Sequence, residues 1–309
     1  MKVQHVLDAL ASGAGENYQW YYSQTGCEGA VMTADNGRLI DIGGRRLYAT
    51  VAGQGTPPVV FDSGLGCAVE KWGALVERTA DVATVVAYDR ANVGRSHAAP
   101  AGRTALDCAA DLRALLRALD VLPPYVLVGH SLGGAHVLVY AGAFPEEVAG
   151  LVLIDPVHED QSDRIRALLP PDAIERSLRI ARGENIDGLN PERLDRLTSD
   201  AQVGNAPLSP VPTVVISHGG PQPEIPNALV PVDVRERLFH ELQRDLVRRI
   251  PGARHELPGR CTVAEQEHAG DGAYVNWHRQ RERPGAPPAR RGFAPSLHPP
   301  ASMRLQYGG

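Results

Sequence analysis

The sequence predicts an α/β protein with a mostly parallel, doubly wound sheet and a small helical insertion between two strands. Short apolar runs, too continuous for strands exposed on one face, alternate along the chain with helical patterns. Such alternation implies right-handed crossovers, which place helices on both faces of the sheet. The chain has 309 residues, 43% hydrophobic and 22% charged, which is enough for one such domain with a sizeable core.

The expected strands follow one another from residue 37 onward. Residues 37–42 and 45–51 are separated by Gly43-Gly44, a pair that is typical of a tight β-hairpin. The later strands are short apolar runs at residues 57–66, 82–90, 125–131, 149–156 and 212–220. Because each run is nearly continuous, we expect these strands to be buried on both faces.

Helical patterns lie between these strands. The clearest covers residues 104–120, where leucines at positions 112, 115, 116 and 119 form one apolar stripe and Thr104 fits the N-cap. Shorter helices are expected at 70–79 and 132–144, and a long one at 232–249.

Residues 157–210 interrupt the alternation of strands and helices. This stretch is charged and helical, with breaks at Pro170-Pro171 and Gly188, and it predicts a small helical lid. Residues 1–36 carry only a weak pattern, and we expect them to form an N-terminal extension to a domain at 37–278.

The most specific chemical signal is a G-x-S-x-G motif, Gly129-His130-Ser131-Leu132-Gly133. It directly follows an apolar run and directly precedes a helix pattern. A nucleophile on such a cramped strand-to-helix turn needs glycines two residues to either side, because they relieve the crowding. We therefore predict that Ser131 is a nucleophile. The alternative is a turn with a structural role alone.

Acyl transfer also needs hydrogen-bond donors for the developing oxyanion. The backbone N–H of Leu132, at the start of the following helix, is one expected donor. The glycine-rich loop at residues 62–66 supplies the other, and we assign it to the N–H of Leu65. An ordinary turn is the alternative role for this loop.

Four segments in this order resemble the α/β-hydrolase fold family, and in particular its lidded esterase-like members. They are FDSGLG (61–66), YDRANVGRS (88–96), LVGHSLGG (127–134) and GLVLIDP (150–156). The resemblance covers about residues 37–255. Members commonly have His-Gly where this chain has Ser63-Gly64, and glycine where it has Asn92, a residue that tolerates the left-handed conformation.

The resemblance also guides the choice of the acid. Members most often carry it in a turn after the strand that follows the lid, but residues 217–221 of this chain contain no aspartate. The other position used in the family is the end of the preceding strand, where Asp155 stands, so Asp155 is expected to orient the histidine. Glu224 is the second choice and Asp160 the third.

The chain order Ser, Asp, His places the general base near the end of the domain. The candidates are His255, His268 and His278. We assign the base to His268, which follows a short apolar stretch and precedes a turn of small residues, although exposed loop histidines are common. Other histidines are expected to pack near the nucleophile (His130 and His136) or to line the pocket (His158 and His218).

The C-terminal segment departs from the resemblance. Residues 279–309 contain six arginines and six prolines and no helical stripe, whereas family members close with an amphipathic helix. The composition fits a disordered basic tail, and it equally fits a GC-rich gene read out of frame. In the second case the native histidine and the closing helix would be missing.

Composition excludes several classes of partner. The net charge of −5 gives no reason to expect nucleic-acid binding. Four cysteines (27, 67, 108 and 261) lack metal-site spacing, so no metal site is expected and free thiols are the default. No leader pattern or long apolar run is present, which predicts a cytoplasmic protein without a membrane partner.

The sequence thus predicts a serine hydrolase that cleaves an ester or related acyl bond of a small-molecule substrate without metal or organic cofactor. A serine at the turn argues against dehalogenase and epoxide-hydrolase chemistry, which the resemblance associates with a carboxylate nucleophile. Peptidase, thioesterase, lactonase and carbon–carbon hydrolase reactions stay open. The rival interpretation is a non-catalytic small-molecule-binding protein or an inactive pseudoenzyme of the same fold.

Overall fold

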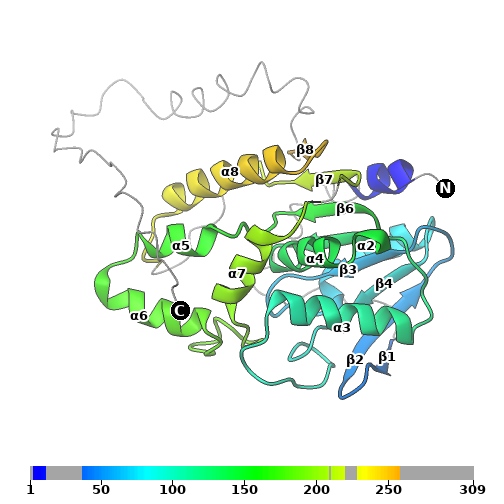
Figure 1. The fold of residues 1–309 in the computed structure, drawn as a ribbon, viewed down its shortest axis with the longest axis horizontal. Helices are drawn as coiled ribbons and strands as arrows, with labels where there is room; N and C mark the ends of the chain where they lie inside the picture. Colours follow the sequence, from blue (N-terminus) through cyan, green and yellow to red (C-terminus); the bar gives the residue numbers. More distant parts are fainter. Residues whose placement is uncertain (1–2, 12–36, 209, 220–227, 258–309) are drawn as a thin grey trace, which may run out of the picture. The chain divides into compact units, whose positions relative to one another are not determined.

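The structure is a computed structural model that describes residues 3–11, 37–208, 210–219 and 228–257. Within these residues, eight strands form one sheet in the order β1-β2-β4-β3-β5-β6-β7-β8 (Figure 1). β1 (Arg38–Asp41) and β2 (Arg46–Ala52) form an antiparallel hairpin, and β2 also pairs antiparallel with β4 (Val85–Tyr88). All other pairs are parallel. The predicted mostly parallel sheet is confirmed.

The remaining strands lie where the apolar runs predicted them, with one addition. They are β3 (Val59–Asp62), β5 (Tyr125–His130), β6 (Val148–Ile154), β7 (Thr213–Ile216) and β8 (Arg254–Glu256). β8 was not expected, because its three polar residues carry no strand pattern. Its pairing with β7, where Val215 lies opposite His255, defines it instead.

Helices cover both faces of the sheet. Successive side chains of a strand point to opposite faces, so apolar strands need cover on both. One face packs against α3 (Ala105–Ala118) and α4 (Leu132–Ala143), with Val60 and Leu127 in the shared core. The opposite face, with Phe61 and Val126, packs against the 3₁₀ turn η1 (Val69–Trp72), α2 (Gly73–Ala80) and the helix at 3–11. The carboxyl ends of the parallel strands are therefore held between two helical layers.

The helix at 3–11 was not assigned from the sequence. Val6, Leu7 and Leu10 are at most 2% exposed, and Val3 packs against the same core. These positions are spaced i, i+3, i+4 and i+7, which is one helical stripe, but the stretch is too short to stand out from its surroundings. The weak patterning of residues 1–36 thus conceals one packed helix.

The start of α3 follows the predicted capping. The Thr104 hydroxyl accepts a hydrogen bond from the Asp107 N–H, and the Asp107 carboxylate accepts one from the Thr104 N–H at 2.8 Å. This reciprocal arrangement is a capping box, which satisfies two N–H groups at the helix start. Leu112, Leu115 and Leu116 are buried, as the predicted stripe requires.

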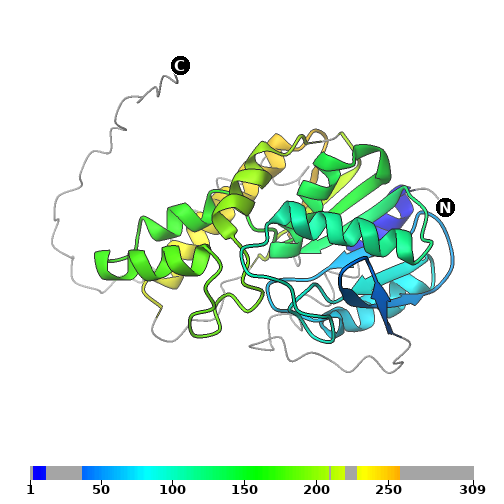
Figure 2. The same ribbon diagram turned by 60° about the horizontal axis from the view of Figure 1, so that its bottom comes forward.

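Three helices follow β6 and precede β7, in the stretch predicted to be a lid. They are α5 (Gln161–Arg166), α6 (Pro171–Ala181) and α7 (Arg196–Asn205). α5 and α6 extend away from the sheet in both views (Figures 1 and 2). The helical insertion is therefore present, while its action as a lid stays a prediction. A short 3₁₀ turn, η2 (Pro145–Glu147), precedes β6, and the long α8 (Val232–Arg249) ends as predicted.

Two further expectations concern the cysteines and the membrane. Cys108 is a buried free thiol, but Cys67 is disulfide-bonded, so the expectation of free thiols is wrong for Cys67. Widely spaced cysteines give no sequence signal for such a pairing. Among the described helices, none combines the length and the apolarity that crossing a bilayer requires.

His136, inside α4, makes the stability of the fold depend on pH. Burial by itself lowers its pKa, but the Cys108 sulfur and the Asp62 carboxylate outweigh this effect and raise the pKa to about 9. The protonated ring therefore stabilises the fold fully below its unfolded pKa of about 6.5, and this stabilisation is lost as the pH rises through 9.

We expect the free energy of unfolding to fall by up to about 3 kcal/mol between pH 6.5 and 9 through this residue. Urea titrations at several pH values would measure how steeply the free energy of unfolding changes with pH. His136→Gln should flatten this dependence, since the other titrating groups are the same in both proteins. Identical slopes for wild type and variant would contradict this role of His136.

Candidate active site

Ser131 lies on a sharp turn between β5 and α4. Its backbone is in a region that side-chain-bearing residues rarely adopt, with φ 51° and ψ −116°. The turn is fixed from neighbouring segments, since the Ser131 N–H donates to the Ile154 carbonyl at 2.9 Å and the Ser131 carbonyl accepts from Val157 N–H at 3.0 Å. The surrounding packing therefore holds the strained conformation in place.

The two outer glycines of the motif permit this turn because other backbone segments approach them closely. A Cβ on Gly129 would lie 2.5 Å from the Gly133 carbonyl oxygen. A Cβ on Gly133 would collide with the Asp62 carbonyl oxygen and lie 2.6 Å from that of Ser63. Gly133 thus brings the turn against the end of β3, where the predicted oxyanion loop begins.

The loop at residues 62–66 lies directly beside Ser131. A Cβ on Gly64 would be 3.5 Å from the Ser131 Cβ and 2.9 Å from Nδ1 of His130. Leu65 follows Gly64 in this loop, and Leu132 begins α4, whose first N–H groups have no partner within the helix. Both predicted oxyanion donors therefore belong to segments that meet at the nucleophile.

Arg90, which follows β4, binds this loop through several hydrogen bonds. Its guanidinium donates to the carbonyls of Ser63 and Gly64 at 2.5 and 2.7 Å and to the Asp62 carboxylate at 2.5 Å. It also binds both carboxylate oxygens of Glu192, one of which accepts the Gly66 N–H at 2.7 Å. The side chains of Arg90, Asp62 and Glu192 are at most 4% exposed.

Asn92 joins this network from the turn after β4. Asn92 has φ 69°, which is the left-handed conformation that asparagine tolerates. Its side chain donates to the Glu192 carbonyl at 3.1 Å and accepts from the Ala99 N–H at 2.9 Å. The segment after β4 is therefore tied both to the loop at residues 62–66 and to the insertion that carries Glu192.

Asp155 follows β6 and contacts His218, which follows the neighbouring strand β7. Oδ1 of Asp155 accepts a hydrogen bond from the His218 N–H at 2.9 Å and lies 3.1 Å from Nδ1 of the same residue. Nε2 of His218 lies 3.1 Å from a carboxylate oxygen of Glu236 in α8. Burial by itself lowers the pKa of His218, but these two carboxylates raise it to about 9.

The pairing of Asp155 with His218 was missed by sequence reasoning, which expected His218 only to line the pocket. One available signal is position, because both residues directly follow apolar runs. The carboxyl ends of adjacent parallel strands lie at the same edge of a sheet, and β6 and β7 are adjacent. Strand order, however, could not be derived from the sequence.

A cavity of about 300 Å³ joins these groups. Ser131, Asp155, His218 and Glu236 line it together with residues of α5 and α8. Val157, Ile165, Leu238 and Phe239 supply its apolar lining. His130 also lines it, and burial lowers the pKa of this ring to about 4, so it is neutral near pH 7. The cavity therefore combines a strained serine with an apolar surface.

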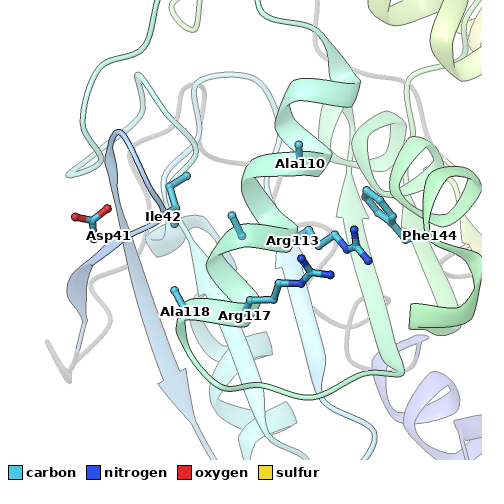
Figure 3. A pocket seen from close by; sticks show the side chains of 8 residues that line it. Asp41, Ile42, Ala110, Arg113, Arg117, Ala118 and Phe144 are labelled. Carbon is cyan, nitrogen blue, oxygen red and sulfur yellow. The ribbon is translucent and has the colours of Figure 1, made fainter.

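A larger hollow of about 440 Å³ lies elsewhere, between the end of β1 and α3 (Figure 3). Its arginines, Arg113 and Arg117, point toward the side of Phe144, and Arg113 donates to Glu147 at 2.6 Å. Its lining residues include no serine, cysteine or histidine. We therefore place the candidate active site at the smaller cavity.

The other predicted candidates fall in different places. His268, His278 and Glu224 lie outside the described residues. Asp160 precedes α5 and is absent from the cavity lining, while Nε2 of His255 lies 2.9 Å from the Ser217 hydroxyl. The other two histidines also lie away from the cavity lining. His136 is in the core, and His158 contacts Asp245 at 3.3 Å.

Comparisons with known proteins agree with the fold. A family model of the alpha/beta hydrolase fold matches residues 57–176. The uncharacterised protein YqjL of Bacillus subtilis is 37% identical over 102 residues, which are 33% of this chain and 40% of YqjL. The chain therefore matches less than half of that relative's length.

Solved structures share the fold at lower identity. A probable hydrolytic enzyme from Pseudomonas aeruginosa PAO1 is 17% identical, with a TM-score of 0.51, and the match covers 83% of this chain and 96% of that one. A second hydrolase from P. aeruginosa is 20% identical, with a TM-score of 0.50, and the match covers 80% and 99% of the two chains.

Proposed function

We propose that this chain, whose fold is that of the alpha/beta hydrolases, is a serine hydrolase that cleaves carboxylic esters or related acyl bonds. Ser131 attacks the acyl carbonyl, and the N–H groups of Leu65 and Leu132 stabilise the oxyanion. Water then releases the acyl group. The observation that carries this proposal is the strained Ser131 backbone, with φ 51°, at the wall of the cavity.

The proposal assigns the general base to His268 and the orienting carboxylate to Asp155. His218 is a poor base near neutral pH, since it stands between two carboxylates that keep it protonated. A carboxylate has two oxygens with about four lone-pair sites, so Asp155 can hold His218 through Oδ1 and still orient a second imidazole. The order Ser131, Asp155, His268 is the one that the fold uses.

Replacing each of the two histidines in turn distinguishes the role of His268 from that of His218. We expect His268→Gln to lower kcat by about 10³-fold, the usual effect of losing a general base, and His218→Gln to lower it less than tenfold. Steady-state kinetics on p-nitrophenyl butyrate would measure both, with circular dichroism to check folding. The opposite ranking would transfer the role of base to His218.

Turnover of simple esters tests the function itself. The apolar lining by Ile165, Leu238 and Phe239 favours short acyl chains, so p-nitrophenyl acetate and butyrate are suitable substrates. We expect saturable hydrolysis by the purified protein, together with an initial burst of p-nitrophenolate if deacylation is the slower step. If the protein binds the esters but hydrolyses them no faster than heat-denatured protein does, it is a non-catalytic binding protein instead.

A further inference from the structure

Three side chains capable of binding a metal ion meet beside the cavity. They are His218, which follows β7, and Glu236 and His240 of α8. A carboxylate oxygen of Glu236 lies 3.1 Å from Nε2 of His218 and 3.9 Å from Nε2 of His240. The ligand atoms of the three residues lie within 4.8 Å of one another. The cluster is thus two imidazoles around one carboxylate.

These separations are close to those of a zinc site. Ligand atoms about 2.0–2.1 Å from a tetrahedral zinc ion lie about 3.3 Å apart. The separation between His218 and Glu236 is already near this value, whereas binding requires His240, whose side chain is 22% exposed, to move closer to the other two ligands. Glu236 and His240 are four residues apart on α8, so they project from the same face of the helix.

His218 is held in the orientation that a metal ligand needs. Its Nδ1 lies 3.1 Å from Oδ1 of Asp155, which is the carboxylate–histidine arrangement that fixes the ring and its tautomer in metal sites. The ring of Phe239 stacks on His218 with 4.1 Å between the centroids and 17° between the planes. Nε2 is therefore directed at Glu236 by contacts on two sides of the ring.

The surrounding charges allow a cation here. The carboxylates of Glu236 and Asp155 carry two negative charges, which balance one divalent ion, and their side chains are 17% and 5% exposed. Arg235 lines the same cavity, and Arg244 lies one turn beyond His240 on α8. These cations reduce the attraction for a weakly held ion such as Ca²⁺, whereas imidazole ligands favour zinc and related transition metals.

We propose that Nε2 of His218, a carboxylate oxygen of Glu236 and Nε2 of His240 bind one divalent transition-metal ion of the zinc class, which displaces to solvent the proton that Nε2 of His218 otherwise carries. Asp155 then acts from the outer shell by orienting His218. Three protein ligands leave a fourth position for water or another small ligand. The proposal does not depend on ester hydrolysis, because binding of the ion is measured directly.

The test uses the full chain after removal of metal with a chelator. Titration with Co²⁺ should give the visible absorption of a low-symmetry, tetrahedral-type site, and calorimetry should give one Zn²⁺ per chain at this site. Glu236→Gln and His240→Ala should each weaken Zn²⁺ binding by about 100-fold or more, because each removes one of three ligands. Glu241→Gln is the matched control, since Glu241 adjoins the cluster in sequence but pairs with Arg164 at 2.8 Å.

Circular dichroism should show that all three variants fold. Asp155→Asn tests the outer shell, and we expect it to weaken the affinity for Zn²⁺ by about 10- to 100-fold. His240→Ala should retain ester hydrolysis, so loss of the ion is distinguishable from loss of the proposed enzyme activity. The proposal is overturned if the wild type binds neither ion, or if Glu236→Gln and His240→Ala bind Zn²⁺ as tightly as the wild type.

Discussion

Replacing Ser131 with alanine should lower kcat for p-nitrophenyl esters by roughly 10³- to 10⁶-fold. The variant keeps the loop at residues 62–66 and the cavity but has no hydroxyl to attack the carbonyl, and losses of this size are typical when the nucleophile of a triad is removed. Alanine has to adopt the same φ near 51° at this turn, so the substitution does not relieve the strain of the backbone. Stopped-flow and steady-state assays of the variant would measure the effect.

Ser177→Ala is the matched control, because Ser177 lies on α6 and is absent from the cavity lining. It should leave kcat within twofold of the wild type. A Ser131→Ala protein that is folded by circular dichroism and still hydrolyses both esters at the wild-type rate would refute the assignment of the nucleophile.

The second large effect concerns Arg90. Arg90→Met should lower the free energy of unfolding by about 3–5 kcal/mol, because it leaves the carboxylates of Asp62 and Glu192 buried without their shared cation. Burial by itself raises the pKa of Asp62, but Arg90 together with His136 and Tyr88 outweighs this effect and keeps the pKa below its ordinary value. The loop at 62–66 also loses two donors, so ester hydrolysis should fall as well. Urea denaturation would measure the change in stability.

An exposed ion pair provides the comparison for Arg90. The side chains of Arg176 and Asp187 are 45% and 75% exposed, so Arg176→Gln should change stability by less than about 1 kcal/mol. Adding Glu192→Gln to Arg90→Met should restore part of the lost stability, since only one buried carboxylate then lacks a cation. Equal unfolding free energies for Arg90→Met and Arg176→Gln would contradict the role given to this network.

Features encoded in short stretches of sequence were predictable. The turn at Ser131 depends on glycines two residues away, and the start of α3 depends on Thr104 and Asp107, so local patterns identify both. The parallel strands are apolar throughout because both of their faces are covered. Most of the fold and one wall of the site follow from such patterns.

Features formed by distant residues were not predictable in this way. Arg90 and Glu192 are 102 residues apart, and His218 and Asp155 are 63 apart. Each pair depends on the order of strands and the path of the insertion, which a single sequence does not specify. β8 and the helix at 3–11 are too short to give a pattern of their own.

Covalent labelling tests most directly whether Ser131 is an activated nucleophile. The purified protein would be treated with a fluorophosphonate and its peptides analysed by mass spectrometry. We expect one adduct per chain, on Ser131, and none in Ser131→Ala. A folded wild-type protein that forms no adduct, or labelling of another serine to the same extent in wild type and Ser131→Ala, would contradict the role of Ser131 as the nucleophile.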